Sequence, residues 1–477
     1  MQTMSTFTEG GFARPQTRRT TGICRHVHSV RLTTAAPMAE LTAVHVLLLA
    51  HYFPPDGGPG AQRPISFARH LPDHGARCTV LTRSQPRQRG PFDPADAAAL
   101  ATVERRCRIV RTDAAMATMP TLLHALAATG QAAIAADRPD VILVTMSPFE
   151  LWPVAAQLGA HHGIPVVADL RDPWALDGVQ DHRTWWHWRR ELRAMRAMLR
   201  AADGVVANTA ECRTLFCQLE RQLAPERVAV VTNGWDADDF APPSPEMAPG
   251  PKLRLVHGGS FLCQELYAHE RPLRRLLGGL RHRPEPIQTS GRTPQHLLRA
   301  LRWLRDRGEP AGNEVHFTAI GMVDDALIRC VHESSVADAV ELAGYRPHTE
   351  VVAAMRQADA LFLTLHGLPA GQRSRIVPGK TYEYLAAGRP ILAALPAGDA
   401  RELVQTSPRA FVADACDDAT IATRLTQLHA RWRAGEFRGA ASPPDCAALE
   451  RRVLAGRLAH FLREVVARFG EQRHQTA

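Results

Sequence analysis

The chain has 477 residues, of which 45% are hydrophobic and 22% charged, and its formal net charge is +9. This length is enough for two or three domains, and no uncharged apolar run approaches the roughly 18–20 residues that span a bilayer, which disfavours an integral membrane protein. The positive charge favours anionic partners, but the arginines are scattered and form no dense patch interleaved with aromatics, which disfavours a nucleic-acid-binding protein.

The nine cysteines are dispersed and show neither a CxxC pair nor a cysteine–histidine spacing typical of zinc. Such a set suits a reducing compartment, so we expect a cytoplasmic protein. Residues 1–37 are rich in Arg, Thr and Ser and lack the apolar segment of a secretory signal. We interpret them as a basic, disordered extension, and translation from Met38 and a transit peptide are the alternatives.

From residue 44 onward, short apolar runs alternate with helical stretches rich in Ala, Leu and Arg, a pattern typical of doubly wound parallel sheets. The expected strands are Val44–Ala50, Cys78–Thr82, Val141–Met146, Pro165–Leu170, Gly204–Asn208, Val228–Thr232, Leu253–Val256, Glu314–Ile320, Ala339–Leu342, Ala360–Leu365, Pro390–Leu395 and Phe411–Ala413. The proline-rich segment between the sixth and seventh runs cannot continue a helix or a central strand. The alternation therefore predicts two α/β domains of similar size.

These boundaries give a specific domain organisation. We predict an N-terminal Rossmann-like domain over residues 38–240, a linker over 241–252 and a C-terminal Rossmann-like domain over 253–440. A C-terminal helix within 441–477 is expected to pack back on the first domain, and His282–Gln295 is interpreted as a surface insertion. Because ligands bind outside the carboxyl ends of parallel strands, two such domains predict a cleft that serves two substrates.

The first expected strand is followed by a glycine-rich segment, His51–Arg63, that leads into a helix. Its glycines allow a ligand to approach backbone N–H groups, and a helix N-terminus favours phosphate. It is not a GxGxxG motif, and Arg83 follows the second strand where a ribose-binding acid would stand, so a dinucleotide oxidoreductase is disfavoured. An ordinary strand-to-helix turn is the alternative.

The fourth strand ends in Asp169-Leu-Arg171-Asp172-Pro-Trp174. Carboxylates and a guanidinium at this edge can hold sugar hydroxyls or balance phosphate charge, and a structural Arg–Asp pair is the alternative. The following helix, Trp185–Arg200, carries an apolar stripe with tryptophans beside an arginine stripe. This pattern fits contact with an anionic membrane or a face that packs on the core.

Two further segments contain candidate ligand groups. The acidic run Asp236-x-Asp238-Asp239 follows a turn, where aspartate is common as a local cap, and metal binding is the alternative. In Arg373–Ile391, a helix begins near Gly379 and ends at Gly388, with Lys380 and Glu383 on one face. Lys380 beside open N–H groups suits a diphosphate, and a carboxylate one turn later suits a vicinal diol, whereas an ordinary cap with an ion pair is the alternative.

Taken together, these segments resemble the large retaining glycosyltransferase family 4, whose members have the GT-B fold of two Rossmann-like domains facing a cleft. The resemblance covers roughly residues 42–400. It is carried in order by His51–Arg63, Pro139–Val144, Asp169–Trp174, Ala202–Thr209, Val231–Asp236 and the donor-segment-like Pro378–Pro390. The branch that it most resembles makes bacterial surface polysaccharides or modifies small or lipid-linked acceptors.

The resemblance implies site residues. Donor-binding residues would be Gly57, Gly58, Gly259, Ser260, Arg271, Tyr345, Arg346, Gly379, Lys380 and Glu383, and Arg171 and Asp172 would lie at the catalytic centre. Arg271 and Lys380 would hold the diphosphate and Glu383 the ribose. Two departures stand out, because Arg375 replaces the first of two glutamates common in the family and Arg171 replaces a common histidine.

The resemblance implies transfer of a hexosyl-type residue from a nucleotide diphosphate sugar, with retention, to a glycan, lipid-linked or small-molecule acceptor. No essential metal and no nucleic acid partner are expected, and the helix Trp185–Arg200 would give peripheral contact with the inner face of the membrane. The alternatives are a sugar-nucleotide epimerase or hydrolase on the same fold and a non-catalytic binding protein.

Overall fold

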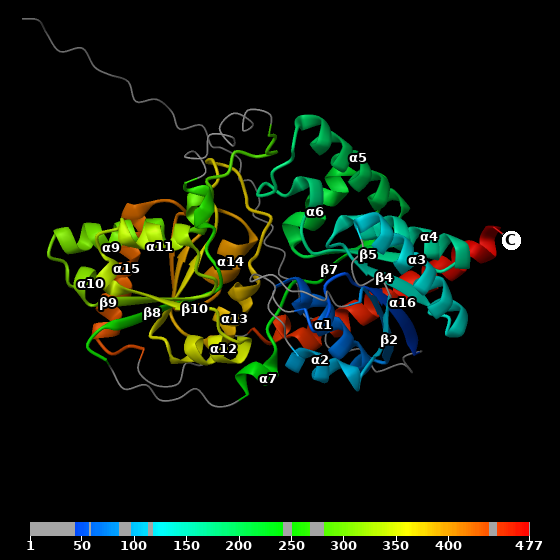
Figure 1. Ribbon diagram of the computed structural model, residues 1–477, viewed down its shortest axis with the longest axis horizontal. Coiled ribbons are helices and arrows are strands. Elements are labelled where there is room, and N and C mark those ends of the chain that lie inside the picture. The colour runs from blue at the N-terminus through cyan, green and yellow to red at the C-terminus, as the bar shows by residue number, and fades with distance from the viewer. Residues whose placement is uncertain are drawn as a thin grey trace, which may run out of the picture. The chain divides into compact units, whose positions relative to one another are not determined.

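The computed structural model describes residues 43–56, 59–84, 97–112, 118–241, 250–267, 281–437 and 446–476 (Figure 1). The predicted extension over residues 1–37 and most of the predicted linker lie outside the described residues. Within them the chain forms two parallel sheets, one of seven strands and one of six. The prediction of two Rossmann-like, doubly wound α/β domains is therefore confirmed.

The first sheet has the strand order β3-β2-β1-β4-β5-β6-β7, and all its pairings are parallel. Its strands are β1 (Val44–Leu49), β2 (Ala76–Thr82), β3 (Arg108–Arg111), β4 (Val141–Thr145), β5 (Val166–Leu170), β6 (Gly204–Ala207) and β7 (Val228–Val230). Strand β3 has no counterpart among the predicted strands. It is a four-residue edge strand with arginine at both ends, so its sequence lacks the continuous apolar run of a central strand.

Helices cover both faces of this sheet. They are α1 (Pro59–His70), α2 (Ala97–Glu104), α3 (Met119–Ala136), α4 (Trp152–His162), α5 (Trp185–Ala201) and α6 (Ala210–Leu219), and the short α7 (Ala237–Phe240) instead packs on a core of the second domain through Phe240. One apolar core joins the sheet to α3, α4, α5 and α6, and a second joins the opposite face to α1. The burial of both faces explains why the central strands are nearly continuous apolar runs.

The second sheet has the order β10-β9-β8-β11-β12-β13 and is also parallel throughout. Its strands are β8 (Leu253–Gly258), β9 (Val315–Ile320), β10 (Val340–Gly344), β11 (Ala360–Thr364), β12 (Ile391–Ala394) and β13 (Ala410–Ala413). From β8 the chain proceeds outward through β9 to β10 at one edge, and from β11 it proceeds outward through β12 to β13 at the other edge. In open α/β sheets, such a switch point forms a crevice at the carboxyl ends of the strands, where ligands bind.

Helices also cover both faces of the second sheet (Figure 1). They are α9 (Gln295–Asp306), α10 (Pro310–Asn313), α11 (Asp325–His332), α12 (His348–Gln357), α13 (Gly379–Ala387), α14 (Asp399–Gln405) and α15 (Asp418–Arg433). Helix α13 ends at Gly388, whose left-handed φ of 64° suits glycine as a helix C-cap. This cap fixes the length of the short helix that carries Lys380 and Glu383.

The chain ends in a long helix, α16 (Arg451–Thr476), that packs against the first sheet and not the second. Leu454, Leu458, Phe461 and Leu462 of α16 lie in the same apolar core as β1 and α1. In the part of the chain that the structure describes, none of the helices has both the length and the apolar character required to cross a membrane.

Candidate functional site

A candidate site lies at the switch point of the second sheet, where β8 ends in His257-Gly258 and is followed by Gly259. Gly259 has a left-handed φ of 119°, and a Cβ atom there would lie 2.6 Å from the Nζ atom of Lys380. The backbone N–H of Gly258 donates a hydrogen bond to the hydroxyl of Tyr384, at 2.8 Å. Both the backbone conformation and the close approach of the lysine therefore require glycine at position 259.

Lys380 lies in the first turn of α13, and its Nζ donates to Nε2 of His257 at 2.9 Å. The other ring nitrogen of His257, Nδ1, lies 2.9 Å from the carbonyl oxygen of Phe362 on β11 and donates to it. Burial, followed by the charge of Lys380, lowers the pKa of His257 well below its usual value. The imidazole is therefore a neutral acceptor that fixes the position of the Lys380 ammonium.

Burial also lowers the pKa of Lys380 to about 8, with Glu383 opposing the shift and Arg292 reinforcing it. The chain has only two lysines, Lys252 and Lys380, and its other permanently cationic side chains are arginines. A lysine ammonium is a compact charge whose pKa responds to burial, whereas a guanidinium stays charged. Lys380 is thus an ammonium that gains stability when an anion approaches it.

Arg292 lies at the end of a short 3-10 helix, Thr289–Arg292, and is the residue that the sequence interpretation missed. Its Nε atom is buried and has no hydrogen-bond partner among the described residues. Burial lowers the pKa of this guanidinium, and the charges of Asp177 and Asp172 oppose the shift. A buried guanidinium with an unused donor, within electrostatic reach of Lys380, is suited to bind an anionic ligand.

The segment that contains Arg292 is not the surface insertion predicted for His282–Gln295. His282 forms a β-bridge with His182 of the first domain, and Gln288 forms one with Gly367 of the second. An open cavity of about 450 Å³ is lined by Asp181, Arg281, Arg283, Glu285, Pro286 and Ile287. Sequence composition alone suggested a solvated loop because Pro, Arg and Ser are frequent there. The long-range backbone pairing instead ties the segment to both domains.

The departure at Arg375 is explained by a contact with this segment. The Nη1 of Arg375 donates to the carbonyl oxygen of Leu176 at 2.8 Å, and its Nη2 forms an ion pair with Glu285. Arg375 therefore links the first domain to the 281–288 segment and has its charge neutralised there. It differs in this respect from Arg292, whose Nε donor is unused.

Glu383, the carboxylate expected to bind the ribose, lies one turn after Lys380 on α13 and is 14% exposed. Its Oε1 is 3.6 Å from Nε2 of His348, which is also 3.2 Å from Oδ2 of Asp239. Burial lowers the pKa of His348, but Asp239 and Glu383 outweigh it and the net shift is upward. The contact with His348 therefore holds the Glu383 carboxylate in position.

The predicted catalytic residues, Arg171 and Asp172, follow β5 and form an ion pair with each other at 3.3 Å. The carbonyl oxygen of Arg171 accepts a hydrogen bond from Asn208 at 3.0 Å. Asp177, which the sequence interpretation did not select, lies nearby. Burial raises the pKa of its carboxyl, and the charges of Asp172 and Glu285 reinforce the shift, while the Val179 N–H and Arg292 oppose it. Asp172, Asp177 and Arg292 are therefore brought together from two domains.

The other predicted residues are placed less centrally. Tyr345 and Arg346 follow β10 and are exposed, with Arg346 3.9 Å from Glu350. The hydroxyl of Ser260 accepts from the N–H of Met322 at 3.1 Å. Gly379 begins α13 with open space where a Cβ would be. Gly57, Gly58 and Arg271 lie outside the described residues.

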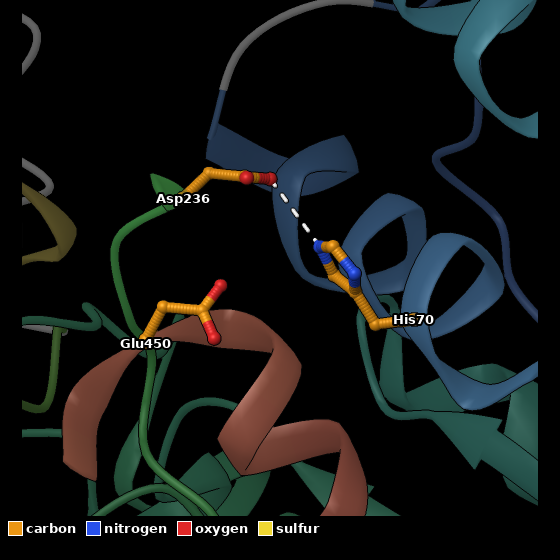
Figure 2. Close-up of side chains that lie close together, drawn as sticks. All are labelled: His70, Asp236 and Glu450. Atoms are coloured by element: carbon orange, nitrogen blue, oxygen red, sulfur yellow. Dashed lines mark hydrogen bonds and ion pairs between the residues drawn. The ribbon is translucent and has the colours of Figure 1, made fainter. Parts of the chain in front are cut away.

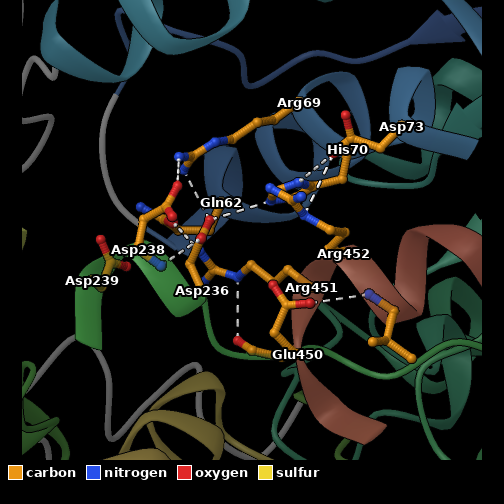
Figure 3. A network of polar contacts seen from close by, with 12 residues as sticks. Gln62, Arg69, His70, Asp73, Asp236, Asp238, Asp239, Glu450, Arg451 and Arg452 are labelled. Atoms are coloured by element: carbon orange, nitrogen blue, oxygen red, sulfur yellow. Dashed lines mark hydrogen bonds and ion pairs between the residues drawn. The ribbon is translucent and has the colours of Figure 1, made fainter. Parts of the chain in front are cut away.

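A separate polar network joins α1, α7 and the start of α16 (Figure 3). His70, Asp236 and Glu450 each offer a ligand atom, and these atoms lie within 4.8 Å of one another (Figure 2). However, Asp236 already pairs with Arg69 at 2.9 Å and accepts from the N–H of Asp238 as the cap of α7. Arg69 supplies the positive charge that a metal ion would provide, so this network is best described as a structural junction.

Comparisons with known proteins assign both domains to one class. The model described as Glycosyltransferase Family 4 matches residues 62–239, and the model described as Glycosyl transferases group 1 matches residues 291–431. No curated protein matches the chain significantly.

Solved structures with the same fold cover nearly the whole chain. Anabaena Alr3699/HepE in complex with UDP and glucose is 16% identical, with a TM-score of 0.52 over 91% of this chain and 99% of that one. The lipopolysaccharide outer core galactosyltransferase WaaB is 12% identical, with a TM-score of 0.53 over 88% and 99% of the two chains. A putative UDP-N-acetylglucosamine 2-epimerase from Listeria monocytogenes is 12% identical, with a TM-score of 0.53 over 89% and 96%. At these identities the likeness shows the fold.

Proposed function

The chain belongs to the family 4-type glycosyltransferases with the GT-B fold, which use nucleotide sugars, and we propose that it moves a hexosyl-type residue with retention to a glycan or lipid-linked acceptor. The retention and the acceptor classes are what the resemblance to family 4 implies. A role in surface polysaccharide synthesis, at the cytoplasmic face of a bacterial membrane, follows from the same resemblance. A small-molecule acceptor is the other acceptor class within this proposal.

The observation that carries the proposal is the pair of cations at the switch point of the second sheet. Arg292 has a buried, unused Nε donor, and Lys380 has its pKa lowered to about 8 by burial. The charges of Asp177 and Asp172 act on Arg292 and that of Glu383 acts on Lys380, but the Nε donor of Arg292 is unused among the described residues. A diphosphate would accept hydrogen bonds from this donor and from the Lys380 ammonium, and these charge-assisted bonds would form in a site already arranged for them.

We assign the remaining donor contacts around this pair. Glu383 would accept hydrogen bonds from the two ribose hydroxyls, Gly259 and Gly379 would let the phosphates approach the backbone, and Ser260 would lie beside them. Tyr345 and Arg346 would contact the base from the end of β10. Gly57, Gly58 and Arg271 keep their proposed roles, although they lie outside the described residues.

Catalysis would depend on positioning and on stabilising the leaving diphosphate, because both cations face the charge that develops there. Arg171, Asp172 and Asp177 lie on the acceptor side of this pair. The pKa of the Asp177 carboxyl is raised by burial first and by Asp172 and Glu285 next, which suits a group that accepts a proton from an acceptor hydroxyl. We propose no enzyme nucleophile and expect no essential metal, so activity should survive treatment with EDTA.

The membrane contact is proposed for the N-terminal end of α5. Trp185 and Trp186 are 41% and 71% exposed, whereas Met195 and Leu199 of the same helix are buried in the core. Arginines 189, 190 and 193 are also exposed on this helix. The apolar stripe is therefore mostly a core-facing surface, and only its tryptophan end is available to an anionic lipid surface.

Vesicle sedimentation tests this contact. We expect the Trp186→Ser variant to bind vesicles containing anionic phospholipid several-fold more weakly than the unmodified chain, with no effect of Trp303→Ser. Trp303 is a matched control because it is 44% exposed on α9 of the other domain. Equal binding by both variants and the parent would remove the lipid contact from the proposal.

Turnover of UDP-, GDP- and ADP-sugars with and without crude acceptor tests the function. Consumption only with acceptor supports transfer, consumption without acceptor favours the epimerase or hydrolase, and nucleotide binding without either favours a non-catalytic protein. The epimerase alternative is considered because a putative UDP-N-acetylglucosamine 2-epimerase has the same fold. Glu383→Ala should lose nucleotide affinity while the exposed Glu341→Ala keeps it; full affinity in Glu383→Ala would remove the ribose assignment.

A further inference from the structure

A second cluster of reactive side chains lies at the carboxyl end of the second sheet and is not used by the proposed reaction. Cys416 follows β13, and its Sγ is 3.6 Å from the hydroxyl of Ser290. That hydroxyl is 3.0 Å from Nε2 of His296, whose Nδ1 donates to Oδ1 of Asp418 at 2.5 Å. A thiol, a hydroxyl, an imidazole and a carboxylate are thus connected in one chain of contacts, the arrangement that activates a sulfur nucleophile.

The backbone holds the sulfur in place against two glycines. Cys416 has a φ of 62°, a left-handed conformation that is uncommon for a non-glycine residue. A Cβ atom on Gly291 would lie 2.9 Å from Sγ, and one on Gly367 would lie 2.8 Å from it. The sulfur therefore contacts two backbone segments that have no spare room around it.

Those two segments lead directly into the donor site. Gly291 precedes Arg292, and Gly367 follows His366, whose pKa is lowered to about 3 by burial first and then by the charges of Arg292 and Arg283. The segments are also held by the backbone pairing of Gln288 with Gly367, with hydrogen bonds of 2.9 Å in both directions. Any group added to the sulfur would push on the backbone that positions Arg292.

The charges around Cys416 favour its thiolate. Burial on its own would raise the pKa of the thiol, but hydrogen bonds from His296 and Ser290 and the charge of His296 outweigh it, and the net shift is downward. The pKa of His296 is raised, because Cys416 and Asp418 together outweigh the lowering effect of burial. Cys107, which is also partly exposed, has its thiol pKa raised to about 11 by burial. Cys107 and Cys416, two of the three partly exposed thiols among the described residues, therefore differ in environment.

We propose that Cys416 is a modification site for small electrophiles, hydroperoxides in particular, and that the adduct displaces the Gly291 and Gly367 segments and weakens nucleotide binding. The second half of this proposal rests on the proposed function. With a hydroperoxide, the sulfur lone pair attacks one peroxide oxygen, the O–O bond breaks and an S–O bond forms. The thiol is oxidised to a sulfenic acid, and the peroxide is reduced, its second oxygen leaving with a proton as water or an alcohol.

Competitive labelling tests the modification site. The full chain is treated at pH 7 with a substoichiometric amount of iodoacetamide, and separately with hydrogen peroxide followed by dimedone, and each cysteine peptide is quantified by mass spectrometry. We expect Cys416 to react on the order of tenfold or more faster than Cys107. His296→Gln and Asp418→Asn should each slow Cys416 and leave Cys107 unchanged. Equal rates at the two cysteines, or no effect of either variant, would overturn the proposal.

The effect on the donor site is measured by UDP binding before and after peroxide treatment. We expect oxidation to weaken UDP binding several-fold in the parent chain, dithiothreitol to restore it, and Cys416→Ser to be insensitive to peroxide. Unchanged UDP affinity in a chain with oxidised Cys416 would overturn the coupling. A chain that binds no nucleotide before oxidation would contradict the proposed function and the coupling together, and the labelling rates would still decide the modification site.

Discussion

Each domain contains an arginine with a buried Nε atom near the carboxyl edge of its sheet, and the two arginines, Arg63 and Arg292, use their donors differently. Arg63 of the first domain donates through Nε and Nη2 to Asp169, through Nη2 to Val231 and through Nη1 to Thr232. Its side chain is 4% exposed and that of Asp169 is 0% exposed. Arg292 of the second domain has a buried Nε with no partner among the described residues.

This difference distinguishes an arginine that stabilises the fold from one that has a donor available for a ligand. A buried guanidinium whose donors are all paired has nothing left for a ligand, so Arg63 and Asp169 serve the fold. The Asp169 carboxylate, which the sequence suggested for sugar hydroxyls or charge balance, belongs to that structural pair. The Nε of Arg292 is a buried donor with no partner among the described residues, so Arg292 is the residue expected to meet an anion.

The largest expected effect comes from breaking the structural pair. We expect Asp169→Asn to lower the free energy of unfolding by about 3–5 kcal/mol, because it leaves the Arg63 charge buried and uncompensated. Urea denaturation measures this. The control is Asp359→Asn, which breaks the partly exposed pair with Arg254 and should cost only about 1 kcal/mol. Equal losses in the two variants would mean that burial does not distinguish the pairs.

Arg292→Gln should have the opposite profile. We expect it to weaken UDP binding by roughly 10- to 100-fold, the equivalent of one or two charge-assisted hydrogen bonds, and to leave the unfolding free energy unchanged or slightly raised. Isothermal titration calorimetry and urea denaturation measure the two quantities. Arg302→Gln is the control, since Arg302 is 56% exposed on α9. A large stability loss in Arg292→Gln with normal UDP affinity would reverse the comparison.

The smallest of the three effects is the pH dependence set by Lys380. Its pKa is about 8, lowered by burial first, so the ammonium that binds a diphosphate is present below pH 8 and lost above it. A bound diphosphate favours the charged form, so binding takes up a proton above pH 8, and affinity should fall about tenfold per pH unit there. Lys380→Arg should abolish this slope between pH 7.5 and 9.5. A slope that persists in the variant would assign the titration to another group.

Much of the fold could be predicted because each central strand is buried on both faces, so its sequence is a nearly continuous apolar run. The helix that carries Lys380 and Glu383 was predictable from local signals, because Pro378 and Gly388 mark its beginning and its end. Strand β3 was not predictable, because an exposed edge strand carries no such apolar run.

The sequence did not predict which distant residues lie close to these side chains. Arg292 meets the charge of Lys380 only because β8 and β11 are adjacent in the sheet, and the ion pair of Arg375 with Glu285 depends on a segment paired to both domains. Contacts between distant segments follow from topology, which periodicity and composition do not specify.

Arg292 and Lys380 are expected to bind the diphosphate of the donor. The ratio of the affinities for UDP and uridine isolates this contribution, because the two ligands share base and ribose. We expect UDP to bind at least about 100-fold more tightly than uridine, and the ratio to fall below about tenfold in the Arg292→Gln, Lys380→Met double variant. A ratio that is the same in the parent chain and the double variant would contradict the account.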